Sequence, residues 1–223
     1  MAVVAGTMTE GGAGSEPGGN AIQMTHINDG TFLVITVGFD STSSTHTAGP
    51  VYYNAVEMTQ LFDDEITQAR LAVYYLVNPS SGSNTLTVNF VGGLPSNRRV
   101  AAHSFSGIDP LDPIGGTATA QEENSTTTIE ATVTVEGASG IIFSSFMSSR
   151  VSSGASTSPH TDVTNQPWTG GVDYTHIAGY GDHTGSDVAV EYDNFTGLLS
   201  NSRKIMYAVE LIASPFIPNV QIV

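Results

Sequence analysis

The stretch TQARLAVYYLVNPSSGSNTLTVNFVGGLPSNRRVAAHSFSG, residues 67–107, decides the fold. It holds three runs rich in β-branched and aromatic residues, separated by the clusters NPSSGSN and GGLPSN. Such runs between clusters of Gly, Pro, Asn and Ser are typical of antiparallel strands joined by short turns. In the first run Leu71, Val73, Tyr75 and Val77 alternate with Ala72, Tyr74 and Leu76. Both faces of this strand are therefore apolar, which predicts a sheet that is covered on both sides.

The same pattern recurs along the chain and predicts an all-β fold. Strands are predicted at residues 21–27, 31–39, 51–58, 67–77, 84–91, 98–107, 126–135, 140–148, 172–180, 187–193 and 203–213. In the second of these, Leu33, Ile35, Val37 and Phe39 alternate with Phe32, Val34 and Thr36. Only residues 63–69 have a helical pattern, and so short a segment does not form a stable helix. We find no convincing internal repeat and predict one antiparallel β-sandwich, jelly-roll-like, of about 8–11 strands.

The predicted sandwich is a single domain over residues 21–213, with an arm at each end. Residues 1–20 are rich in glycine and contain no bulky aromatic residue, so we expect a flexible or extended N-terminal arm. Residues 148–168 are rich in Ser, Thr, Gly and Pro and too long for a hairpin turn, which predicts a surface loop suited to recognition. Residues 214–223 form an extended apolar arm, because Pro215 and Pro218 are incompatible with a central strand.

The C-terminal arm carries large apolar side chains that we expect to pack against protein rather than stay in water. They are Phe216, Ile217, Val220, Ile222 and Val223. The arm packs either on its own domain or on a neighbouring subunit, and the two prolines, which direct it outward, favour the neighbour. We therefore expect a homo-oligomer, with a trimer as one form.

Composition excludes several classes of function. The 223 residues include 6 Lys and Arg against 21 Asp and Glu, for a formal net charge of −15. Because cationic contacts to phosphates dominate nucleic-acid affinity, we expect no nucleic-acid partner, and equally no docking on an anionic membrane. The chain has no cysteine, so disulfides and thiolate metal sites are excluded. Residues 1–20 lack the cationic segment and apolar core of a secretory signal, and no run reaches membrane-spanning length.

Sequence motifs for catalysis are missing. The six histidines show no HExxH pairing, no Gly-x-Ser-x-Gly elbow occurs, and no glycine-rich phosphate loop joins a strand to a helix. His103 lies in an apolar strand and is expected to be a structural residue with its hydrogen bonds satisfied. The best candidate for chemistry is GDHTGSD, residues 181–187, where a histidine lies beside carboxylates, with Glu191 and Asp193 close behind. A hairpin loop explains this run better.

Three other groups of residues have a structural and a functional interpretation. Asp63, Asp64 and Glu65 offer oxygen ligands for Ca²⁺, but without EF-hand spacing we favour a solvated acidic loop. Asp109 and Asp112 each precede a proline, which is turn chemistry.

The third group is Trp168, with Tyr174 and Tyr180 nearby. It either forms a stacking platform for a sugar or a protein partner or anchors the long loop on the sandwich. We predict no catalytic residue, metal ligand or cofactor, and a partner contact at Trp168 and at the five apolar residues of the C-terminal arm.

Three segments resemble a family of β-sandwich domains of bacterial surface proteins and phage particles. VYYLVNPSSGSNTLTVNF is similar to that family's hairpin, RVAAHSFSGID to a strand end, and KIMYAVELIA to its closing strand. The resemblance spans residues 21–213, and its motifs are structural, so it implies a fold and no catalytic residue.

The resemblance and the missing export signal favour a phage particle. We expect a non-enzymatic virion structural protein, a capsid decoration (cement) protein on the particle surface, bound to the major capsid protein or another virion protein. The alternative is an extracellular location, as a carbohydrate- or cell-surface-binding module of a tail, fibre or secreted surface protein. A glycan-cleaving enzyme is a third hypothesis, because paired carboxylates are brought together only by the fold.

Overall fold

The protein is an all-β molecule, as the sequence predicts. The computed structural model describes residues 2–11, 20–40, 46–95, 97–123, 127–149, 153–156, 161–168, 174–196 and 202–215, with the backbone alone for 153–156, 161–168, 174 and 194–196. The strands are β1 (Val4–Gly11), β2 (Ala21–Asn28), β3 (Phe32–Phe39), β4 (Thr47–Tyr53), β5 (Val56–Glu57), β6 (Thr59–Ile66), β7 (Ala69–Val77), β8 (Gly82–Val91), β9 (Arg98–Ser106), β10 (Ile114–Glu122), β11 (Ile129–Val133), β12 (Gly140–Ser149), β13 (Ser153–Ser156), β14 (Thr161–Trp168), β15 (Tyr174–His183), β16 (Val188–Thr196) and β17 (Arg203–Ile212). Within these ranges no helix is long and apolar enough to cross a membrane.

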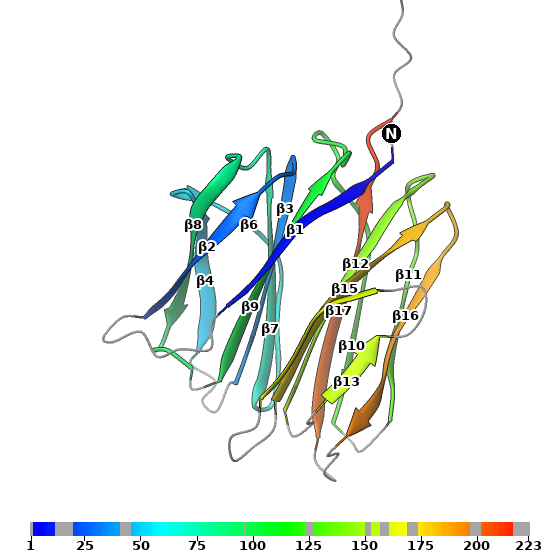
Figure 1. The fold of residues 1–223 in the computed structure, drawn as a ribbon. Coiled ribbons are helices and arrows are strands. Elements are labelled where there is room, and N and C mark those ends of the chain that lie inside the picture. Colours follow the sequence, from blue (N-terminus) through cyan, green and yellow to red (C-terminus); the bar gives the residue numbers. More distant parts are fainter. Residues whose placement is uncertain are drawn as a thin grey trace, which may run out of the picture.

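The strands form four antiparallel sheets. The first half of the chain contributes an inner sheet, β1-β9-β3-β7-β6, and an outer sheet, β2-β8-β4-β5. The second half contributes an inner sheet, β10-β17-β12-β15-β14, and an outer sheet, β11-β16-β13. Figure 1 shows the first half in blue to green and the second half in green to red, with the two outer sheets on opposite sides of the molecule.

Three hydrophobic cores hold the sheets in a four-layer stack. One core joins the first outer sheet to the first inner sheet, a second joins the two inner sheets, and a third joins the second inner sheet to the second outer sheet. β3 shows why: Leu33 and Ile35 face the first core, while Phe32 and Val34 face the core between the halves. The two-sided apolar pattern of β3 and β7 is confirmed, because each inner sheet is covered on both faces.

The two halves have the same strand order. In this comparison β10, β11 and β12 correspond to β1, β2 and β3, β13 corresponds to β4, and β14–β17 correspond to β6–β9. The strands of the two inner sheets then follow the same order. The outer sheets then have the same order too, and within the described residues β5 has no counterpart. The sequence showed no convincing repeat and predicted one sandwich of fewer strands; the structure instead has two sandwiches with equivalent inner sheets packed back to back.

Several predicted segments differ in the structure. Residues 4–11 of the expected N-terminal arm form β1, paired with β9. Residues 59–66 form β6 in place of a short helical segment or an acidic loop; β6 pairs with β7, where Arg70 forms ion pairs with Asp63 and Glu65. The expected loop at residues 148–168 contains β13 and β14, which pair with β16 and β15.

Candidate functional site

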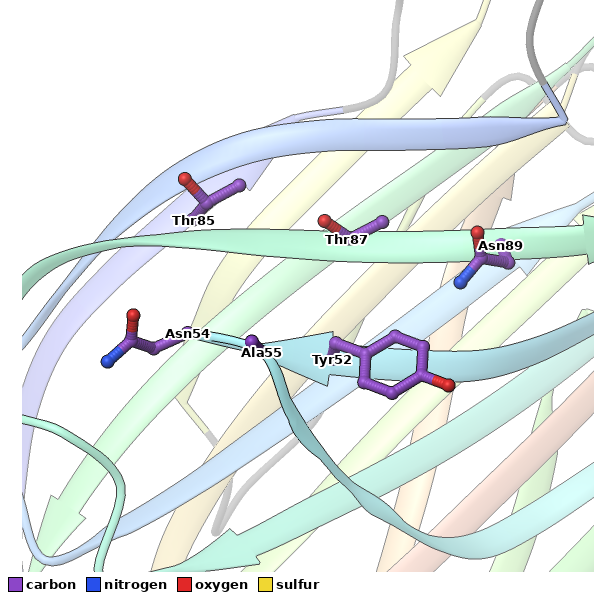
Figure 2. A pocket seen from close by; sticks show the side chains of 6 residues that line it. All are labelled: Tyr52, Asn54, Ala55, Thr85, Thr87 and Asn89. Atoms are coloured by element: carbon purple, nitrogen blue, oxygen red, sulfur yellow. The ribbon is translucent and has the colours of Figure 1, made fainter.

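An open groove on the first outer sheet is a candidate binding site. It has a volume of about 580 Å³ and lies over β8, β4 and the turn that follows β4. Its lining residues are Tyr52, Asn54, Ala55, Thr85, Thr87 and Asn89. Figure 2 shows Thr85, Thr87 and Asn89 in a row along β8, with Tyr52, Asn54 and Ala55 along the neighbouring segment.

Strand alternation places these side chains outward. In β8, Leu86, Val88 and Phe90 are buried in the core, so the residues between them face away from it. In β4, Val51 and Tyr53 are fully buried, which turns Tyr52 outward. Tyr52 and Thr87 are direct cross-strand partners, so the tyrosine ring and the threonine hydroxyl share one face of the sheet.

A tight turn closes one end of the groove. Tyr53 pairs with Val56, which leaves Asn54 and Ala55 as the two turn residues, with φ of 49° and 62°. Positive φ at both positions is the signature of a type I′ hairpin turn. The Asn54 N–H donates to the Thr85 carbonyl at 2.9 Å, which ties the turn to β8.

The polar groups of the groove are uncharged, and some are held in place. Asn89 Nδ2 donates to the Pro50 carbonyl at 2.7 Å, and Asn54 Nδ2 donates to Ser80 Oγ at 3.0 Å, so each amide oxygen remains available as an acceptor. This surface therefore offers donors, acceptors and one aromatic ring, and no formal charge.

A second hollow lies at the end of the molecule where the two described chain ends meet. It has a volume of about 390 Å³ and contains the predicted candidate Asp182–His183 pair. Its lining residues are Ala2, Val3, Ser139, Gly140, Asp182, His183 and Ala213. Asp182 is exposed and His183 is buried, so the two side chains do not form one accessible pair.

His183 is engaged within the protein. Its Nδ1 accepts from the Gly185 N–H at 3.3 Å, and its Nε2 lies 3.2 Å from Glu210 Oε1, close enough for an ion pair although not aligned for a hydrogen bond. Burial lowers the pKa of His183, against the opposing effect of Glu210 and Asp182. The fully buried Glu210 accepts from the N–H groups of Gly116, Glu136 and Gly137, so this carboxylate supports the backbone.

The other predicted residues are placed as follows. Asp109 Oδ1 accepts from the Leu111 N–H at 2.9 Å, which confirms its role in a turn. Within the described ranges no three His, Asp or Glu residues are arranged to hold a metal ion. Trp168 lies in β14 opposite Tyr174, but the side chains of both are outside the described part. Phe216, Ile217, Val220, Ile222 and Val223 also lie outside the described residues.

His103 differs from the expectation of a satisfied histidine. It is 2 % exposed, and neither ring nitrogen has a hydrogen-bond partner within the described ranges. Its ring lies against Phe105 of its own strand and against Phe143 and Tyr180 of the second half. Burial lowers the pKa of His103 to about 4.

The groove was missed from the sequence, although a signal was present. In SNTLTVNFV, residues 83–91, the apolar residues alternate with Thr, Thr and Asn, which marks a polar outer face. What the sequence does not contain is the cross-strand partner, and the pairing of Tyr52 with Thr87 follows only from the register of β4 on β8. No protein-family model, curated protein or solved structure matches this chain.

Proposed function

We propose that the chain is a non-enzymatic structural protein of a virus particle, of the decoration type that binds an assembled shell and stabilises it. The observation that carries the proposal is the position of the chain ends. The Ala2 carbonyl lies against Gly107, and the Ser214 N–H donates to the Gly107 carbonyl at 2.7 Å. Both described ends therefore lie at one end of the stack, near the N label of Figure 1.

This position suits attachment by the C-terminal arm. Residues 216–223 follow directly on Pro215, and their five large apolar side chains are those expected to contact a partner. Each such side chain contributes roughly 1.5–3 kcal/mol when it is fully buried, before ordering costs. The partner that we propose is the major capsid protein or another virion protein, together with copies of this chain in a homo-oligomer.

We further infer that each half is a jelly roll. The order β1-β9-β3-β7 facing β2-β8-β4-β5 has the connectivity of two interleaved Greek keys, with β6 added at one edge. The second half repeats this order, and the part of it that the structure describes has no β5 equivalent. Jelly rolls occur in viral capsid and lectin domains, which is compatible with the proposal but does not by itself define a function.

The chemistry we propose is surface complementarity without a cofactor. Many weak, identical contacts repeated over a symmetric shell supply avidity, so no single strong site is needed. The net charge of −15 keeps the free protein soluble before it docks.

The test compares three chains on purified particles: the full chain, a chain ending at Pro215, and a chain with Gly/Ser in place of residues 216–223. The last two keep the contact between Ser214 and Gly107, so all three should unfold at the same temperature. The full chain should occupy the particles and raise their thermal stability, and both altered chains should lose occupancy. Equal occupancy of all three, or absence of the chain from purified virions by mass spectrometry, would refute the proposal.

The alternative is a carbohydrate- or cell-surface-binding module. The groove of Tyr52 and Thr87 favours it specifically, at a different place from the Trp168 region that the sequence suggested. The two functions are compatible, because the groove and the chain ends are formed by separate residues.

A further inference from the structure

We propose that the groove between β8 and β4 is a binding site for an uncharged glycan. The ring of Tyr52 stacks on one sugar ring, and Thr85, Thr87 and Asn89 bind hydroxyl groups along the glycan. This inference is independent of the virion role, because it rests on the first outer sheet alone.

The chemistry of the lining matches hydroxyl groups. A sugar hydroxyl both donates and accepts, and Thr hydroxyls and Asn amides do the same, whereas carboxylates only accept and ammonium groups only donate. Tyr52 is half-buried and lines the groove, so part of its side chain is accessible to a ligand there. A tyrosine adds apolar contact area and a polar tip, which suits a ligand that has C–H faces and hydroxyl edges.

The site is largely preformed. β8 pairs with β2 on one side and with β4 on the other, and the residues behind the groove are fully buried. The amides of Asn89 and Asn54 are oriented by their hydrogen bonds to Pro50 and Ser80. A ligand therefore orders few side chains when it binds, which reduces the entropic cost of association.

The length of the row favours an oligosaccharide. Thr85 and Asn89 are four residues apart in one strand, which is roughly 13 Å at about 3.3 Å per residue. That distance exceeds a single sugar ring, so the row contacts neighbouring units of a glycan chain. The groove volume of about 580 Å³ is within the usual range for small-ligand sites.

Charge determines which glycans fit. Glu57 pairs with Tyr52 across β4 and β5, and the chain as a whole carries −15. The cation Arg70 already pairs with Asp63 and Glu65. Uronate and sulfate groups would be repelled, so the ligand is neutral.

A peptide does not fit the same features. Adding a strand needs an unpaired edge, and the backbone of β8 is paired on both sides. The groove also lacks the apolar pocket that an aromatic or aliphatic anchor of a protein partner would fill.

The second half supplies an internal comparison. β16 has the place of β8, and its outward residues beside buried Val190 and Tyr192 are Ala189, Glu191 and Asp193. Thr132 is exposed on the neighbouring β11. The outward residues of β8 are thus neutral, whereas two of those described on its counterpart β16 are acidic.

The experiment is affinity electrophoresis of the full chain in native gels that contain one polysaccharide each. The neutral probes are dextran, galactomannan and mixed-linkage β-glucan, and the anionic probe is alginate. Any polysaccharide that retards the chain is then titrated by calorimetry. We expect retardation by at least one neutral polysaccharide and none by alginate. Tyr52→Ala should weaken binding about tenfold or more, which is about 1.4 kcal/mol. Tyr52→Phe, which keeps the ring, should weaken binding much less. Thr87→Val should weaken binding about threefold to tenfold.

The matched control is Thr132→Val, the same change on the outer sheet of the second half, which should leave binding unchanged. Circular dichroism of each variant checks folding, and threonine to valine is a favourable change in a strand. The proposal is overturned if no neutral polysaccharide retards the chain, if Tyr52→Ala binds as well as the parent, or if alginate binds equally. Loss of particle occupancy by Tyr52→Ala without any glycan binding would instead assign the groove to a protein contact.

Discussion

Acid should destabilise this protein through histidines buried between its two halves. His103 and His176 are 2 % and 1 % exposed, and burial lowers their pKa values from 6.5 to about 4 and about 3. His176 Nε2 lies 3.0 Å from Thr36 Oγ1 across the two inner sheets, and His103 packs on rings of the second half. Both imidazoles are therefore neutral in the folded state.

The direction in which stability changes with pH follows from proton linkage. Below pH 6.5 the unfolded chain binds protons at these sites and the folded chain does not, so the free energy of unfolding falls as the pH falls toward the folded pKa values. At pH 5 the difference is about 1.5 pH units, and each histidine lowers the free energy of unfolding by about 2 kcal/mol. At pH 8 both contributions vanish.

The assay is urea unfolding from pH 8 to pH 4, followed by circular dichroism, for the parent, His103→Leu and His103→Gln. Both variants remove one titrating group. Between pH 8 and pH 5 the free energy of unfolding of each variant should therefore fall by about 2 kcal/mol less than that of the parent, which corresponds to about 1 M in the urea midpoint. Leucine and glutamine differ in polarity, so their absolute stabilities at pH 8 separate packing effects from titration. A parent-like pH profile in both variants would refute the neutral, buried state of His103.

Three further predictions concern stability. Ala55→Gly should raise the free energy of unfolding by about 1 kcal/mol in a urea titration, because Ala55 has a φ of 62° and glycine removes the left-handed strain; Val56→Gly, outside the turn, should not stabilise. Glu210→Gln should cost about 1–3 kcal/mol in thermal or urea unfolding, because an amide NH₂ cannot accept the backbone N–H groups that the carboxylate binds, and an unchanged stability would contradict that network. Gly116→Ala should lower the melting temperature more than Gly82→Ala, since a Cβ at Gly116 collides with the Thr134 carbonyl oxygen, whereas one at Gly82 meets no atom and costs only the strain of alanine at a φ of 79°, about 1 kcal/mol.

The strands that the sequence predicts are those buried on at least one face. β3, β7, β9, β12 and β17 have apolar residues on both faces, because each lies inside an inner sheet. The strands that it missed are β1, β6, β10, β13 and β14, and each is at the edge of its sheet. Edge strands are half-solvated and tolerate charge, as in the DDE of β6, or small residues, as in the GGTATA of β10. Their sequences therefore resemble loops and arms.

The candidate site was predictable in its parts but not in its assembly. Alternation in β8 predicts which residues face outward, and it predicts nothing about the strand beside them. The turn at Asn54 and Ala55 was also hidden, because alanine is an unusual residue at positive φ and does not signal a hairpin as Asn-Gly does. The apolar arm at residues 216–223 stays a prediction.

The equivalent strand order of the halves explains why one outer face can specialise. The inner sheets are fixed by their role, since they bury apolar residues on both sides and join the halves through pairs such as Phe62 and Tyr207, whose rings stack 4.6 Å apart. The outer sheets bury only one face each, so their solvent-facing residues change without cost to any core. In the outer sheet of the second half, Glu130 lies directly opposite Glu191. This pair has like charges and no aromatic ring. In the first half, Tyr52 lies opposite Thr87, and β5 and its turn extend the outer sheet beside them. Recognition at the first outer sheet and acidity at the second are consequently separable, and substitutions in the groove should leave the interface between the halves intact.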